Sequence, residues 1–157
     1  MPAPLHTSTD ALRHVLVTLD DRFEHAVGDA PSGFAAFEAG QGARTPLALV
    51  RHVRGLMRFA AALWAGTELD EAPPLDWASE VAAWRHDLAA LDALFRAQPT
   101  PSGSVGAHQV LQGPLLDAAT HIGQLTLLRR LAGAPVERRS YWQVSMAELD
   151  AATTPAR

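Results

Sequence analysis

Four stretches of the sequence, each about 20 residues long, place apolar side chains at steps of three and four, the period of a helix with one buried face. Runs rich in glycine, proline and small residues separate them. No segment alternates apolar and polar residues as a strand does, and the chain has no internal repeat. The sequence therefore predicts an all-α fold, a four-helix bundle.

The first two helices have recognisable ends. The first is predicted over residues 10–27 and the second over residues 45–64. Thr45 is suited to capping the free backbone amides of the second helix, and Pro46 suits its first turn because proline has no N–H to leave unpaired. Gly66 follows as a C-terminal stop. Between the two helices, residues 28–44 read as a long loop with one helical turn near Phe34 to Phe37.

The third helix is predicted to start after Asp76, its N-cap, and to end near Ala97. Its charged side chains are expected to face water: Arg85, His86, Asp87 and Asp92. A loop over residues 98–106 leads to the last long helix, which ends near Leu131. Gly113 and Pro114 mark either the start of that helix or a kink in it.

A chain of 157 residues with 48% hydrophobic and 19% charged residues suits one globular domain. We expect residues 1–157 to form that domain, with a core over about 8–150, a short packing helix within 140–150, and short tails. The sequence contains no cysteine, so histidine and carboxylate are its only strong metal ligands.

The charge pattern argues against nucleic acid as a partner. Seventeen acidic residues outweigh 13 basic ones, the formal net charge is -4, and no basic run is longer than a pair. No apolar stretch reaches the roughly 18 residues that span a bilayer, and residues 1–10 lack the features of a secretory signal. We therefore expect no membrane association and a cytoplasmic location.

The last helix carries an acid and a histidine, Asp117 and His121, among many apolar residues. Those apolar residues surround its axis almost completely, which predicts a centrally buried helix: Leu115, Leu116, Ala118, Ala119, Ile122, Leu125, Leu127, Leu128 and Leu131. An unpartnered buried carboxylate would cost several kcal/mol. Asp117 must therefore lie at a mouth, be paired, be protonated, or bind a cation.

Two interpretations of this pair are open. The spacing i, i+4 puts both side chains on one face, where Asp117 and His121 could share a ligand or a proton. In a purely structural role they would form a satisfied pair, joined by Arg51 or Arg54 from a neighbouring helix. A lone D-x-x-x-H is weak evidence for a metal, since H-E-x-x-H is the specific helical pattern.

A third side chain strengthens the metal hypothesis. His52 falls at the border of the apolar stripe of the second helix, where it can turn inward. His52, Asp117 and His121 would then offer two imidazoles and a carboxylate and leave positions open, a set that suits divalent Fe, Ni, Zn or Mn. The other histidines are interpreted as solvated or locally bonded: His6, His14, His25, His86 and His108.

Two segments, "TPLALVRHVRGLMRFA" and "LQGPLLDAATHIGQLTLLRRLAGAPV", resemble the DinB-like family, which is grouped with the YfiT-like metalloenzymes. The order of helices and loops matches over roughly residues 8–150. The resemblance implies an up-down-down-up bundle, a homodimer, and a divalent metal, often nickel, zinc or iron, held by three histidines. It also implies a low-molecular-weight thiol as co-substrate in some members.

Carried over by position, the family's ligands fall on His52 and His121, and the first histidine of its H-x-x-x-H pattern falls on Asp117. A carboxylate binds the same ions but adds a negative charge and favours harder metals. The resemblance thus implies a metal-dependent enzyme, transferase-like or hydrolase-like, whose metal activates a bound water, thiol or carbonyl. The alternative is a non-catalytic binding or structural bundle with a degenerate site.

Overall fold

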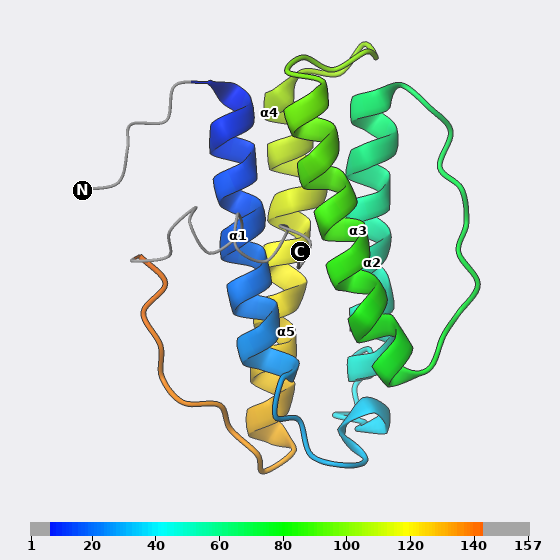
Figure 1. The fold of residues 1–157 in the computed structure, drawn as a ribbon. Coiled ribbons are helices and arrows are strands. Elements are labelled where there is room, and N and C mark those ends of the chain that lie inside the picture. Colours follow the sequence, from blue (N-terminus) through cyan, green and yellow to red (C-terminus); the bar gives the residue numbers. More distant parts are fainter. Residues whose placement is uncertain (1–6, 143–157) are drawn as a thin grey trace, which may run out of the picture.

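A computed structural model describes residues 7–142, and in that range the chain is helical and contains no strand (Figure 1). The elements follow in the order α1 (Ser8–Val27), η1 (Phe34–Ala36), α2 (Pro46–Ala65), α3 (Trp77–Ala97), α4 (Ala107–Val110), η2 (Leu111–Leu115) and α5 (Leu116–Leu131). The all-α prediction is confirmed. Residues 140–142 are not helical, and the rest of the short helix expected over 140–150 lies outside the described residues.

Four long helices lie side by side along one direction, with the connection over residues 66–76 running back along the outside from the end of α2 to the start of α3 (Figure 1). Both α1 and α2 contact α3 and α5. The core between them is apolar and includes fully buried aromatic side chains: Phe23, Trp64, Trp84 and Phe95. Within the described range, no helix combines the length and apolarity needed to cross a membrane.

Side-chain caps fix where the long helices begin. The Ala48 N–H donates to Thr45 Oγ1 at 3.3 Å at the start of α2, and the Ser79 N–H donates to Asp76 Oδ1 at 2.8 Å at the start of α3. Both predicted caps are therefore confirmed. Helix α1 begins earlier than predicted because Thr7 caps it and Asp10 closes a capping box as the third helical residue.

Helix α2 ends at a position where glycine fits better than any residue with a side chain. Gly66 adopts φ 69°, and a Cβ there would lie 3.3 Å from the backbone nitrogen of Gly103. We expect Gly66→Ala to lower the free energy of unfolding by about 1–2 kcal/mol, since it combines a left-handed backbone with a close approach.

Urea denaturation of the variant measures this loss. Gly55→Ala is the matched control, because Gly55 lies inside α2 and nothing would stand within 4 Å of its Cβ. That change should be neutral or stabilise by up to about 1 kcal/mol. A Gly66→Ala protein as stable as the parent would contradict the close-packed turn.

Gly113 and Pro114 do not start the last helix but lie in a single π-helical turn, η2, between α4 and α5. Proline has no N–H and crowds the preceding turn, and the Leu116 N–H bonds to the carbonyl of Leu111 across the wider turn. Of the two alternatives left open by the sequence, the interruption within the helix is therefore the correct one. The turn ends at Leu115, two residues before Asp117.

The prediction that α5 is centrally buried is wrong. Ala118, Ile122, Leu125 and Leu128 are buried, whereas Leu116, Leu127 and Leu131 are 51%, 54% and 57% exposed. Helix α5 packs mainly against α1 and α2, so the side of α5 that faces away from both is not covered by the described residues. Apolar residues all around a helix axis predict a buried helix only if other elements pack against every side of that helix.

The expectation that Asp92 faces water is also wrong. Asp92 is only 1% exposed, and its carboxylate accepts hydrogen bonds from Arg13 Nε and Arg96 Nε, both at 2.7 Å. A buried charge is tolerated because it is paired. Asp92 therefore connects α3 to α1 instead of decorating the surface.

Candidate metal centre

Helices α2 and α5 bring the three predicted ligands to one point. His52 lies on α2, and Asp117 and His121 lie one turn apart on α5, which contacts α2. His52 Nε2 is 3.5 Å from Asp117 Oδ2, and His121 Nε2 is 3.3 Å from Asp117 Oδ1. One ligand atom from each residue lies within 4.8 Å of the other two. The inward turn expected of His52 is therefore present.

These separations fit a shared ion. Two ligand atoms that each stand about 2.1 Å from one ion lie about 3.0–3.4 Å apart in octahedral or tetrahedral geometry. The two nitrogen–oxygen distances run to the two different oxygens of Asp117, and both are near this range and longer than most N–H···O hydrogen bonds. The imidazoles of His52 and His121 meet edge to face, with centroids 4.5 Å apart and an interplanar angle of 86°. The donor set thus fits a divalent cation.

The cluster is open to solvent on one side. The side chains of His52 and Asp117 are 32% and 46% exposed, and that of His121 is 15% exposed. Asp117 consequently lies at a mouth, as one of the sequence alternatives required, and is also paired with both histidines. This exposure leaves room for an ion or a small molecule to approach the three donors.

Gln124 orients one of the imidazoles. Its Oε1 lies 2.9 Å from His121 Nδ1 on the same helix. Because an amide oxygen only accepts, Nδ1 carries the proton in this contact and the lone pair of Nε2 points toward Asp117. Such a partner fixes the tautomer and the ring orientation that ligation needs.

The charge state of His52 also suits ligation. Burial lowers the pKa of His52 below 6.5, the nearby His121 and Arg44 lower it further, and Asp117 acts in the opposite direction. A lowered pKa means that the imidazole is predominantly neutral at pH 7. Only a neutral imidazole binds a metal ion, so protons compete little with a cation at this residue near pH 7.

The structural alternative in which an arginine of α2 joins the Asp117–His121 pair is wrong. Arg51 donates to Glu80 at 3.0 Å, and Arg54 donates to Glu80 at 3.0 Å and to Asp87 at 2.9 Å. Both guanidinium groups are therefore held toward α3. Among residues 7–142, the carboxylate of Asp117 instead lies next to the imidazoles of His52 and His121.

The loop over residues 28–44 borders the site through its last residues, whereas the loop over residues 98–106 packs on the C-terminal end of α2. Arg44 is the residue near the cluster to which the sequence assigned no role. A lone arginine beside a helix cap carries no recognisable signal, and only the fold brings it next to His52. The remaining described histidines stay outside the cluster: His14, His25, His86 and His108.

Comparison of the chain with family models, with curated proteins and with solved structures found no match. The geometry and chemistry of the three side chains on α2 and α5 are therefore what support a function.

Proposed function

We propose that this chain is a divalent-metal-dependent enzyme in which His52, Asp117 and His121 hold the ion. One observation carries the proposal: two imidazoles and one carboxylate from two separate helices offer ligand atoms within 4.8 Å of one another at a solvent-open point. Bundles commonly bind metals between facing helices in this way. The same positions correspond to the metal ligands of the DinB-like family, whose up-down-down-up topology we propose for the four long helices.

The donor set favours nickel, zinc or iron, with manganese as a further candidate. Two imidazoles and a carboxylate suit borderline divalent ions, and the negative charge of Asp117 shifts the preference toward the harder members of that group. Three protein ligands leave at least one coordination position open. A cation at such a position acts as a Lewis acid on a bound water, thiol or carbonyl.

The residues of the chain have separable tasks in this proposal. His52 and His121 supply neutral nitrogen ligands, and Asp117 supplies a negatively charged oxygen ligand. Gln124 holds the His121 ring in the ligating tautomer. We assign a transferase-like or hydrolase-like reaction to the open side of the cluster. Use of a low-molecular-weight thiol and homodimerisation remain proposals from the family resemblance.

Metal analysis of untagged protein purified without a nickel column tests the proposal. We expect about one equivalent of divalent metal per chain, and we expect chelation to lower the melting temperature. Metal at a thousand times its dissociation constant stabilises the native state by about 4 kcal/mol. Less than about a tenth of an equivalent, with no recovery on adding zinc, nickel, iron or manganese, would favour the non-catalytic bundle.

A further inference from the structure

Two hollows flank the candidate metal centre, one on each side. The first has a volume of about 510 Å³ and is lined by α5 and the end of the loop before α2, including His121, Gln124 and Leu127. The second has a volume of about 500 Å³ and is lined by α2 and the connection after it, including His52 and Phe59. Arg44 lines both. The cluster therefore lies between two concave surfaces that have the guanidinium of Arg44 in common.

Exposed apolar side chains gather at these hollows. In the described part of the chain, six large hydrophobic side chains are exposed, and four of them line the two hollows: Phe59, Leu69, Leu127 and Leu131. Solvent-exposed apolar side chains collected around a few polar groups are typical of a ligand site. The concentration of these side chains beside a metal-binding cluster indicates that the ligand has an apolar body.

Arg44 supplies a cation that no carboxylate of the described residues neutralises. Its side chain is exposed, and no carboxylate of residues 7–142 pairs with it. The arginines farther along α2 differ, because Arg51 and Arg54 bind Glu80, and Arg58 lies 3.9 Å from Asp70. A guanidinium left unpaired at the rim of a hollow is suited to bind a carboxylate in two-point geometry.

We propose that the substrate is an apolar organic acid, which lies in the hollow along α5 with its carboxylate on Arg44 and its apolar body against Leu127 and Leu131. This inference rests on the proposed metal-dependent function and names the substrate class of that site. The hollow along α5 is the better candidate, because His121 and Gln124 line it together with four leucines. A ligand held there lies directly beside His121, one of the three proposed metal ligands.

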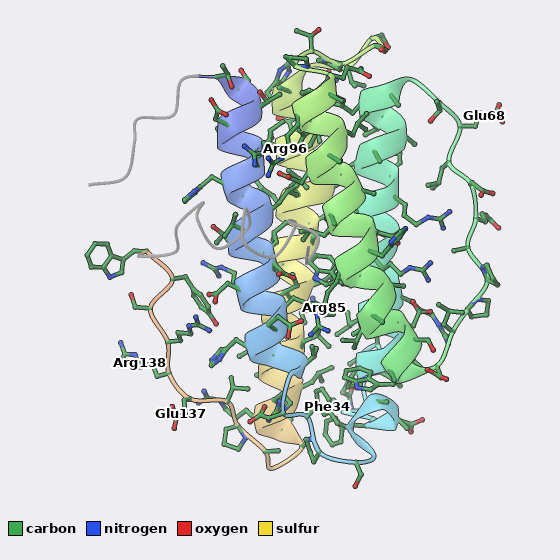
Figure 2. The ribbon with its side chains drawn as sticks, in the orientation of Figure 1. Phe34, Glu68, Arg85, Arg96, Glu137 and Arg138 are labelled. Atoms are coloured by element: carbon green, nitrogen blue, oxygen red, sulfur yellow. The ribbon has the colours of Figure 1, made fainter. Side chains whose placement is uncertain are left out.

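Calorimetric titration of zinc-loaded protein with 4-phenylbutyrate and with its neutral amide, 4-phenylbutanamide, tests the proposal. We expect the acid to bind about tenfold more tightly than the amide, and we expect Arg44→Gln to remove that preference. Arg138→Gln is the matched control, since Arg138 lies on the segment after α5 and points away from the helices (Figure 2). The control should keep the preference.

Zinc affinity, measured on the same variants, separates a ligand-binding role from a structural one. Because Arg44 repels a cation near His52, Arg44→Gln should bind zinc as tightly as the parent or more tightly while losing the acid. Loss of both would instead mean that Arg44 only supports the fold, and it would overturn the proposal. Equal binding of acid and amide to the parent protein would overturn it as well.

Two further measurements separate the acid site from the metal function and from a dimer interface. If the parent protein binds no zinc but metal-free protein still prefers the acid through Arg44, the metal function fails and the acid site stands. Leu127→Glu should weaken binding of the acid without changing the molar mass in solution, because Leu127 forms the wall of the hollow. Conversion of a dimer to a monomer by Leu127→Glu would assign this face to a second copy of the chain and overturn the proposal.

Discussion

Replacing His121 with alanine is expected to weaken zinc binding about a hundredfold or more and to leave the helices intact. His121 contributes one of three ligand atoms, and loss of even an outer-shell partner typically costs 10–100-fold in metal affinity. Alanine is the best helix former, and the His121 side chain is not part of the apolar core. Competition with a chromophoric chelator measures the affinity, and circular dichroism measures the helix content.

His86→Ala is the matched control, because His86 is an exposed histidine on α3 and not part of the cluster. That variant should bind zinc as the parent protein does. Gln124→Ala should give an intermediate loss, since Gln124 only orients the His121 ring. Unchanged zinc affinity in the His121→Ala protein would show that the ion binds elsewhere.

Truncating Glu80 to alanine is expected to lower the free energy of unfolding by about 3–5 kcal/mol. Glu80 is 1% exposed, and its carboxylate accepts hydrogen bonds from Arg51 Nε at 3.0 Å, from Arg54 Nη1 at 3.0 Å and from the Leu75 N–H at 2.9 Å. Its removal leaves these donors without their acceptor between α2, α3 and the connection. For a chain of this size the melting temperature should fall by about 10 °C, as measured by calorimetry.

Two further variants show whether the loss of stability comes from the buried carboxylate of Glu80. Glu68→Ala should change the stability by less than about 0.5 kcal/mol, since Glu68 lies on the outer connection and points away from the helices (Figure 2). Glu80→Gln should fall between the two, because it keeps an acceptor of the same shape without the charge. If Glu80→Ala lost less than about 1 kcal/mol, the buried ion pairs would not hold α2 to α3.

The helix boundaries were predictable because they depend on local chemistry. Thr45, Pro46 and Asp76 act within one turn of their own position, and Gly66 ends α2 through its own backbone conformation. The clustering of His52, Asp117 and His121 was predictable for a related reason. Asp117 and His121 share a face by helix geometry alone, and the position of His52 in its stripe left few directions for its side chain.

The predictions that were wrong concern the burial of side chains, which depends on the neighbouring elements that pack against them. Asp92 is buried because Arg13 of α1 reaches it in addition to Arg96, one turn along α3, and no pattern within α3 indicates the contact with Arg13. Leu127 is exposed because no described helix covers that side of α5. Arg44 could not be predicted as a site residue, because the hollow that it lines forms only when its loop meets α5.

The most direct test of the proposed metal centre is a crystal structure of the zinc-loaded protein with anomalous data collected at the zinc edge. We predict one strong peak per chain, about 2.0–2.2 Å from a nitrogen of His52, a nitrogen of His121 and an oxygen of Asp117. A peak bound to other residues, or no peak at the contact of α2 and α5 at saturating zinc, would contradict the metal centre.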